Sequence, residues 1–567
     1  MSASSSPAIW FDRITFSDGT EISLDLGDVV VLVGPNNAGK SVALSDLYEL
    51  MTNRRYSGIV IRSSHLEKQG SVEDLSSFLA ARARLDTDGD RTIYHGYGGH
   101  FIAGPLAHLW DDVPGPLGVP FSQRLGADGR IGLASSMTMK IDPLAEPATR
   151  PIDMVYIDDV LELRLSSWFQ RAFDKELTLD RGRGGGLPFV VGKVPKREGD
   201  EDRTSTSYLA RLRAACTDLD RNGDGMRAFG GVILHLFAPS IPSVLLLDEP
   251  EAFLHPPQAR LLGELIARER RPDSQLFLAT HSADVLEGLL SAAPKNLRII
   301  RLERAGDVNR ARKLDSDETA RIAADPLLRF SSVLSGLFHR RVILCESDAD
   351  CLFYKTLLHT RAVSRDQHPD VHFVHGGGKD RLPALARVLR NLGVRVDVIA
   401  DMDALDREEF VQSLVEAVGG DWPAIQADVK RLHKAIENNA PPKLEDVKDQ
   451  LRSVLDREFC SVGELKKSID DVLRSSSPWR RLKISGRAAI PPGQPMKQFN
   501  SVDAAFRTWG LWLVPVGELE GFCRTVGGKG PPWVQAVLEE HDPETSPELE
   551  SAREFLRVLW HGPDEGA

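Results

Sequence analysis

Four residues near the start of the sequence have the types and spacing of a phosphate-binding loop. Gly34, Gly39, Lys40 and Ser41 fit the pattern GxxxxGKS/T. In such a loop backbone NH groups surround the phosphates, the lysine reaches the β- and γ-phosphates, and the hydroxyl contacts Mg²⁺. The apolar run 29–33 predicts a buried strand before the loop, and helical spacing after it predicts a helix whose N-terminus faces the anion. We expect the residues between the two glycines to bind ATP as well, namely Asn36, Asn37 and Ala38.

An acidic pair follows a second apolar run much later in the chain. Residues 244–247 are apolar and lead directly into Asp248 and Glu249. A phosphate-binding loop needs such a partner, because the strand places its aspartate near the Mg²⁺ and the next residue can polarise the attacking water. The next predicted strand, 276–279, leads to His281, which we expect to contact the γ-phosphate. Taken alone, Asp248 and Glu249 would more simply form an acidic turn, and His281 would more simply be a structural histidine.

Acidic residues also follow two predicted strands in the second half of the chain. Strand 342–345 leads into Glu346, and strand 394–400 leads into Asp401 and Asp403. Alternation of strands and helices implies a parallel sheet, and the carboxyl ends of its strands form the edge where such sheets place their sites. Carboxylates that converge there suit Mg²⁺ or Mn²⁺. A solvated turn is the plainer interpretation of either cluster alone, but the two together predict a metal site.

Composition sets limits on the class of protein. At 567 residues the chain is too long for one hydrophobic core. It has no apolar stretch long enough to span a bilayer and no signal-peptide pattern at its start, so we expect a cytoplasmic protein without a membrane partner. The five cysteines include no CxxC pair, which argues against structural zinc. The net charge of −12 does not indicate nucleic-acid binding, but carboxylates gathered for metal ions contribute to it.

Two long stretches carry none of these motifs. Between 56 and 207 the periodicity is weak and turn residues are frequent, which we interpret as the rest of the ATPase sheet with an inserted arm or dimerisation element. Between 405 and 505 apolar residues at helical spacing predict three amphipathic helices, which either pack on one another or dock a partner. A further strand is predicted at 511–516.

The motifs of the first half resemble those of ABC-type ATPase heads of the SMC and RecF kind. GPNNAGKS, LLLDEPEAFLHP and LATHS occur in the order found in such heads. The resemblance implies that two copies enclose ATP and that a signature turn from each contacts the nucleotide of the other. The matching turn here is Gly223-Asp224-Gly225-Met226, with Asp224 where many heads carry a serine.

The second half resembles a Toprim domain. In this comparison Glu346 is the characteristic glutamate, Asp401 and Asp403 are the DxD pair, and Asp350 matches a second acidic position of the nuclease branch. Ser347 stands where a glycine is usual.

An ABC-type head followed by a Toprim domain resembles the OLD family of ATP-dependent nucleases, which includes the nuclease subunit of the Gabija anti-phage system. The resemblance implies an α/β fold with an ATPase domain at 1–330 and a Toprim nuclease domain at 331–567, interrupted by a helical insertion at 405–505. It also implies a late metal ligand, Glu520 or alternatively Glu518, and a late lysine, Lys529, that neutralises charge at the scissile phosphate.

We therefore expect an ATP-binding and ATP-hydrolysing, divalent-metal-dependent DNA endonuclease of anti-phage defence. Glu346, Asp401 and Asp403 would hold one ion, and Asp350 and Glu520 would help to hold another. The resemblance implies a homo-oligomer through the ATPase heads, with a helicase or other defence protein as a possible partner. Two alternatives stay open: a DNA-repair ATPase with a non-catalytic Toprim scaffold, and a Toprim nuclease that cuts RNA.

Overall fold

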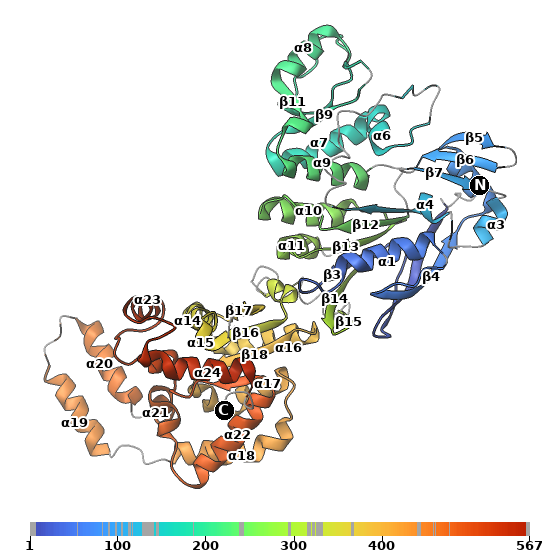
Figure 1. Cartoon of the computed structure of the whole chain (residues 1–567). Coiled ribbons are helices and arrows are strands. Elements are labelled where there is room, and N and C mark those ends of the chain that lie inside the picture. Colours follow the sequence, from blue (N-terminus) through green and yellow to red (C-terminus); the bar gives the residue numbers. More distant parts are fainter. Residues whose placement is uncertain are drawn as a thin grey trace. The chain divides into compact units, whose positions relative to one another are not determined.

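The apolar run before the phosphate-binding loop forms strand β3 (Val29–Val33) in the computed structural model of the chain (Figure 1). The chain divides into two units, Met1–Phe338 and His339–Ala567, and β3 belongs to the first. The predicted boundary between 330 and 331 lies outside the described residues. The structure describes residues 7–53, 55–81, 83–88, 91–96, 99–103, 106–111, 115, 117–126, 141–142, 144, 147–184, 186–237, 243–292, 296–314, 319, 324, 333–364, 368–438, 444–457, 459, 461–475 and 477–562.

The first unit contains both strands and helices. Its strands are β1 (Ala8–Phe16), β2 (Glu21–Ser23), β3, β4 (Ile61–Gln69), β5 (Arg84–Asp88), β6 (Arg91–Gly96), β7 (Gly99–Ala103), β8 (Ser122–Leu125), β9 (Glu176–Leu179), β10 (Phe189–Gly192), β11 (Cys216–Asp218), β12 (Val244–Asp248), β13 (Gln275–Ala279), β14 (Leu297–Ala305) and β15 (Val308–Lys313). Its helices are α1 (Lys40–Thr52), α2 (Val72–Ala80), α3 (Leu106–Asp111), α4 (Gly118–Phe121), α6 (Pro151–Ile157), α7 (Asp159–Phe173), α8 (Thr206–Ala215), η1 (Leu219–Arg221), α9 (Asp224–Phe237), α10 (Pro256–Glu269), α11 (Ala283–Ser291) and η2 (Leu334–Phe338).

A six-stranded sheet forms the centre of the first unit. Its order is β15-β14-β3-β13-β12-β8, and all neighbours are parallel except β14 and β15. Every residue of β3 and β13 is buried, as expected for strands covered on both faces. The carboxyl ends of β3, β12 and β13 therefore meet at one edge of this sheet.

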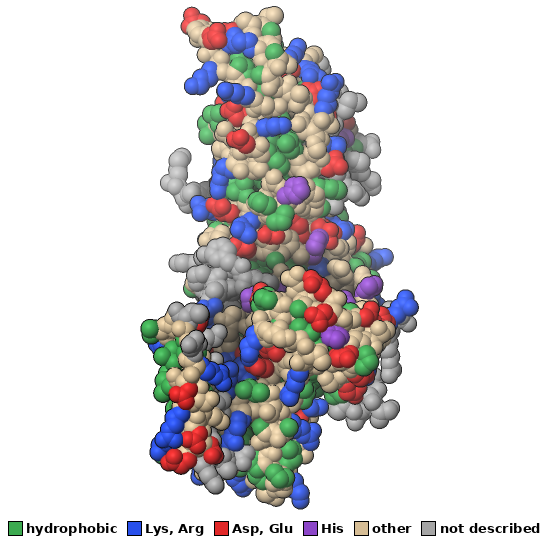
Figure 2. All heavy atoms as spheres, turned by 90° about the vertical axis from the view of Figure 1, so that its left-hand side faces the viewer, with side chains coloured by type: hydrophobic (Ala, Val, Ile, Leu, Met, Phe, Trp, Pro, Cys, Tyr) green, Lys and Arg blue, Asp and Glu red, His purple; other side chains and the backbone are tan. Residues whose placement is uncertain are grey.

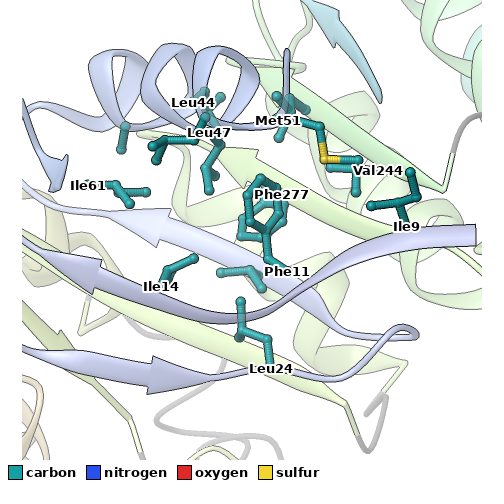
Figure 3. Close-up of a cluster of buried hydrophobic side chains, with 14 of the residues drawn as sticks. Ile9, Phe11, Ile14, Leu24, Leu44, Leu47, Met51, Ile61, Val244 and Phe277 are labelled. Carbon is teal, nitrogen blue, oxygen red and sulfur yellow. The ribbon is translucent and has the colours of Figure 1, made fainter. Parts of the chain in front are cut away.

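A second, antiparallel sheet of order β2-β1-β4 packs on α1 and the central sheet. Figure 3 shows Leu44, Leu47 and Met51 of α1 beside Phe277 of β13 and Phe11 of β1. The two phenylalanine rings meet edge to face with centroids 5.7 Å apart, an arrangement that aromatic quadrupoles favour. This apolar cluster anchors α1, the helix that begins at the phosphate-binding loop.

The stretch 56–207 contributes to several layers. Strand β8 joins the edge of the central sheet, while β5, β6 and β7 form an antiparallel sheet of their own. A further antiparallel sheet of order β11-β10-β9 contacts α7 through β9, and α7 packs against α9. The arm interpretation of this stretch stays a prediction.

The second unit is built on a smaller sheet. Its strands are β16 (Arg341–Cys345), β17 (Val371–His375), β18 (Arg395–Ala400) and β19 (Leu511–Leu513). Its helices are α14 (Asp348–Leu358), α15 (Arg361–Ser364), η3 (Lys379–Arg381), α16 (Leu382–Asn391), η4 (Met402–Asp406), α17 (Glu408–Ala417), α18 (Trp422–Glu437), α19 (Leu444–Leu455), α20 (Val462–Ser475), α21 (Pro478–Ser485), η5 (Gly486–Ala489), α22 (Gln494–Thr508), η6 (Leu519–Phe522), α23 (Pro531–Glu540), η7 (Pro547–Leu549) and α24 (Glu550–His561).

All four strands of this sheet are parallel, in the order β17-β16-β18-β19. Helices α14, α23 and α24 pack in one apolar cluster with side chains of β16, β18 and β19. Helix α16 contacts β16 and β18, and α22 contacts β19. The order brings the carboxyl ends of β16 and β18 side by side, which is where the predicted metal ligands follow.

The three predicted amphipathic helices of the insertion are present as α18, α19 and α20. Helix α18 packs against α22, and α19 packs against α20. The predicted strand at 511–516 is shorter in the structure, since β19 ends at Leu513. Pro515 explains the difference, because it has no NH group to donate to a neighbouring strand.

Charged side chains of both signs are interspersed on the face of the molecule in Figure 2. Among the described residues, no helix combines the length and the apolar character needed to cross a membrane.

Candidate functional site

The phosphate-binding loop leaves β3 through a backbone position that only glycine can occupy. Gly34 has φ +143°, and a Cβ atom built on it would lie 2.1 Å from the carbonyl oxygen of Leu302 in β14. Gly39 and Asn37 also have positive φ, +92° and +63°. Left-handed backbone positions of this kind are typical of the nests that bind phosphate through NH groups.

Lys40 and Ser41 begin helix α1 directly after this loop. Lys40 is buried, and its Nζ donates to the carbonyl oxygens of Gly34 and Pro35 at 2.7 and 3.0 Å. Burial lowers the pKa of Lys40 below its ordinary value, although nearby carboxylates oppose the shift. Ser41 Oγ donates to Asp248 Oδ1 at 2.9 Å. The structure thus brings together the hydroxyl and the carboxylate that would hold Mg²⁺ beside a triphosphate.

Glu249 and His281 lie at the ends of the two neighbouring strands. His281 Nδ1 is 3.3 Å from Glu249 Oε1. Glu249 has φ +47°, an uncommon left-handed conformation for a non-glycine residue. Glu251, which sequence reasoning missed, is buried and accepts from Thr280 Oγ1 at 2.6 Å and from the backbone NH of His281 at 3.1 Å. Glu251 therefore orients the turn that carries His281.

Two further residues at this site come from strands that carry no motif. Arg124 of β8 places its guanidinium 3.7 Å from Asp248 Oδ2. Asn309 of β15 donates through Nδ2 to the carbonyl oxygen of Ala38 at 2.8 Å, inside the phosphate-binding loop. No sequence signal marks either residue, because their proximity depends on strand order.

The predicted signature turn lies at the start of α9. Asp224 forms an ion pair with Arg227, whose Nη1 lies 3.0 Å from Asp224 Oδ1. A Cβ atom on Gly225 would lie 2.6 Å from the carbonyl oxygen of Phe253, so this position is restricted to glycine by close packing.

In the second unit, Glu346, Asp401 and Asp403 come together at the ends of β16 and β18. Each offers a carboxylate oxygen, and the three oxygens lie within 4.8 Å of one another. Glu346 Oε1 also accepts from the backbone NH of Asp401 at 3.2 Å. The register of β16 and β18, with Leu344 opposite Val398, accounts for this convergence.

The donor set fits a hard divalent cation. Burial raises the pKa of Glu346 and, more strongly, that of Asp401, and repulsion from neighbouring carboxylates adds to both shifts. Asp403 Oδ1 is buried and has no hydrogen-bond partner among the described residues. Three partly buried carboxylates that crowd together are costly unless cations compensate their charge, and oxygen donors of this kind suit Mg²⁺ or Mn²⁺.

Two family models match parts of the chain that include some of the residues of these two sites. A model of an AAA domain (AAA_21), whose description names the AbiEii toxin and a type IV TA system, matches residues 164–287. A model of the Toprim domain of overcoming lysogenization defect (OLD) protein-like proteins matches residues 337–403. The chain joins an ATPase to an OLD-like Toprim domain. The predicted fold class and the resemblance to the OLD family are thereby confirmed, and the two domains support an ATP-dependent nuclease.

Solved structures similar to the chain include SMC heads. The SMC head bound to the C-winged helix domain of ScpA is 13% identical, covers 55% of this chain and 100% of its own, and has a TM-score of 0.33. The SMC head domain from Thermotoga maritima is also 13% identical, covers 55% and 100%, and has a TM-score of 0.28. Scores this low add nothing to the fold described above. No curated protein matches the chain.

Ser347 of the Toprim domain occupies a backbone position open to any residue, with φ −132°. Its Oγ accepts from the backbone NH of Asp350 at 3.3 Å, and Asp350 Oδ2 accepts from the backbone NH of Ser347 at 2.8 Å. This reciprocal capping starts α14 and fixes Asp350. Burial raises the pKa of Asp350, and the negative charge of Glu520 raises it further.

The late acidic residues of the Toprim domain have separate partners. Glu518 Oε1 accepts from Lys529 Nζ at 2.6 Å, and Glu520 Oε1 accepts from the backbone NH of Gly530 at 2.9 Å. The choice between Glu518 and Glu520 as metal ligand stays open, and the role of Lys529 stays a prediction.

Two lysines contact carboxylates of the trio, and sequence reasoning assigned neither of them. Lys483 Nζ lies 3.0 Å from Asp401 Oδ2 and 3.1 Å from Asp403 Oδ2. A second lysine, Lys379, donates to the carbonyl oxygen of Asp403 at 3.1 Å. Lys379 ends the glycine run HGGGK, and this run was a sequence signal that could have identified it. Lys483 lies in the helical insertion, where no sequence signal marks it.

Proposed function

We propose that the protein is a divalent-metal-dependent DNA endonuclease whose ATPase head controls the Toprim centre. The observation that carries this proposal is the convergence of Glu346, Asp401 and Asp403, with three oxygens within 4.8 Å at the carboxyl edge of a parallel sheet. Divalent ions bound there would polarise a phosphodiester and activate water. The ATPase domain and the Toprim domain together support a nuclease. That its substrate is DNA is part of the proposal.

The protein's residues have distinct parts in this scheme. Glu346, Asp401 and Asp403 would hold one ion, while Asp350 and either Glu518 or Glu520 would complete a second position. The capping of α14 keeps Asp350 in place, and Lys529 would neutralise charge at the phosphate. In the ATPase head, Lys40, Ser41 and Asp248 would bind ATP with Mg²⁺, and Glu249 and His281 would act on the γ-phosphate. Nucleotide state would bias head pairing and so access to the nuclease centre.

Ser347 bears on the alternative of a non-catalytic Toprim scaffold. A serine at a position where Toprim domains usually carry glycine would favour this alternative if it distorted the turn. An extended φ of −132° imposes no strain on serine. The conformation therefore supports an intact turn and favours the nuclease.

A substrate assay separates the remaining possibilities. Purified protein and the Glu346→Gln variant are incubated with supercoiled plasmid or structured RNA, in Mg²⁺ or Mn²⁺, with and without ATP. Plasmid nicking or linearisation that the variant lacks is the expected result. RNA cleavage alone would transfer the proposal to RNA, and ATP hydrolysis without any cleavage would favour the scaffold. The same incubations are carried out with the Lys40→Met variant, which lacks the lysine of the phosphate-binding loop. Comparison with the wild type shows whether ATP activates or restrains cleavage.

An anti-phage role, a homo-oligomer joined through the heads, and a helicase or other defence partner are further proposals that rest on the resemblance to the OLD family. Light scattering of Glu249→Gln protein with and without ATP tests the oligomer, because slowed hydrolysis should accumulate the ATP-bound assembly. An unchanged mass would count against assembly through the heads.

A further inference from the structure

Lys483 binds the two oxygens that a metal ion at the Toprim centre would use. Its ammonium is 3.0 Å from Asp401 Oδ2 and 3.1 Å from Asp403 Oδ2, and both carboxylates are largely buried. Asp401 and Asp403 also belong to the three-oxygen cluster with Glu346. One ammonium therefore satisfies part of the negative charge that a divalent ion would otherwise neutralise.

The backbone around Lys483 is held tightly against the site. A Cβ atom on Gly517 would lie 2.1 Å from the carbonyl oxygen of Lys483, and one on Gly486 would lie 2.2 Å from that of Pro515. The backbone NH of Met402, between the two aspartates, donates to the carbonyl oxygen of Gly517 at 2.9 Å. Helix α21 thus delivers Lys483 to the carboxylates through close backbone packing, and the charge lies at the end of a four-carbon side chain, which is flexible in lysines generally.

An ammonium and a divalent ion cannot both use these oxygens favourably. Two cations at ligand distance from the same carboxylates repel strongly in a partly buried site. Lys379 also lies 3.4 Å from Asp403 Oδ2, but its closest bond, at 3.1 Å, is to the backbone carbonyl of Asp403, and it contacts Asp406 Oδ2 at 3.4 Å. Lys379 can keep the bonds to the carbonyl and to Asp406 when Asp403 turns to an ion, whereas the two contacts of the Lys483 ammonium described above are both with carboxylates of the trio.

We propose that Lys483 is an exchangeable counter-cation of the Toprim carboxylates: it neutralises Asp401 and Asp403 until a divalent ion displaces it. The inference rests on the proposed metal site and adds a role for the helical insertion. Through Lys483, the insertion sets the concentration of divalent ion at which the centre fills. Any movement of α21 would change that concentration.

Titration calorimetry of Mn²⁺ into metal-free, nucleotide-free full-length protein tests the exchange. Removal of the competing charge in Lys483→Met should lower the Mn²⁺ dissociation constant by about tenfold or more. Lys483→Arg keeps a competing positive charge and should therefore lack the gain in Mn²⁺ affinity that Lys483→Met shows. Lys497→Met removes an exposed lysine of α22 and should bind like the wild type.

Asp401→Asn separates failure of the exchange from failure of the site. If the wild type and Asp401→Asn give the same heat, the metal site and the exchange are both overturned. If Asp401→Asn loses the heat but Lys483→Met binds like the wild type or more weakly, only the exchange is overturned.

Thermal unfolding gives a second test of the exchange in case the Lys483→Met variant folds poorly. Without Mn²⁺, Lys483→Met should melt below the wild type, because its carboxylates lack a cation. Mn²⁺ should then raise its melting temperature by more than that of the wild type. A purely structural lysine would lower the melting temperature equally with and without Mn²⁺, and that result would contradict the exchange.

Discussion

Substitution of Asp397 tests how the Toprim sheet holds its site in place. Asp397 of β18 is buried, and its Oδ2 accepts from Arg341 Nε of β16 at 2.5 Å. Its Oδ1 accepts from Trp512 Nε1 of β19 at 2.8 Å. Arg341 Nη2 in turn donates to the carbonyl oxygen of Leu559 in α24 at 2.8 Å. This network joins three strands and one helix on the sheet that carries Glu346.

The change Asp397→Asn keeps the shape but removes the charge opposite Arg341. Both side chains of the pair are about 5% exposed or less, so the arginine would remain charged in a site with little water. Removing one partner of a buried pair costs about 3–5 kcal/mol, because the other charge is left uncompensated. We therefore expect the second unit of Asp397→Asn to lose about 3 kcal/mol or more of its free energy of unfolding.

Urea unfolding, followed through the fluorescence of the unit's tryptophans, measures this loss. The double variant Arg341→Met with Asp397→Leu removes both charges, and we expect it to be more stable than Asp397→Asn alone. A loss below about 1 kcal/mol in Asp397→Asn would refute the reasoning, because it would show that water or another group compensates Arg341. A double variant less stable than Asp397→Asn would refute it as well.

Three further substitutions probe other parts of the chain. Burial lowers the pKa of His235 in α9 to about 4. The unfolded chain therefore binds the extra proton as pH falls from about 6.5 to 4, and the wild type should lose about 3 kcal/mol more than His235→Gln between pH 7 and pH 4. Equal losses in denaturant titrations would contradict this. Asn309→Leu leaves the buried carbonyl of Ala38 without its 2.8 Å donor, at a cost of about 1–3 kcal/mol. Binding of a fluorescent ATP analogue should weaken accordingly, and unchanged affinity would show that the loop does not need this bond. Ser347→Gly removes a helix cap at a cost of only about a few tenths of a kcal/mol, so we expect cleavage to stay within about threefold. Strong activation would instead show that serine impairs the turn.

The motifs could be predicted from the sequence because each lies next to the strand that positions it. Residues 29–33 form β3 with the bounds that the apolar run predicted, and Glu346 and Asp401 follow β16 and β18 at once. Because sites gather at the carboxyl edge of parallel strands, the sequence also predicts that Glu346, Asp401 and Asp403 lie together, as they do in the structure.

Residues that act from distant segments could not be predicted in this way. Asn309 reaches the phosphate-binding loop because β15 pairs with β14, and sequence patterns do not specify that order. Lys483 is 80 positions from Asp403 and lies in a helix whose charged side chains look like an ordinary solvated surface. Strand β19 ends at Leu513, because Pro515 follows two residues later. The apolar pattern of 511–516 predicted a longer strand, although this proline was a local signal against it.

A comparison of two aspartates of the Toprim domain tests directly whether the carboxylate trio is the nuclease centre. Asp401 belongs to the carboxylate trio, whereas Asp348 is exposed in the first turn of α14, outside the trio. Cleavage of supercoiled plasmid in Mn²⁺ is measured for Asp401→Asn, Asp348→Asn and the wild type, with ATP hydrolysis followed in parallel. We expect Asp401→Asn to lose cleavage and keep ATP hydrolysis, and Asp348→Asn to keep both. If Asp401→Asn cleaved plasmid as fast as the wild type, the assignment of the nuclease centre would be contradicted.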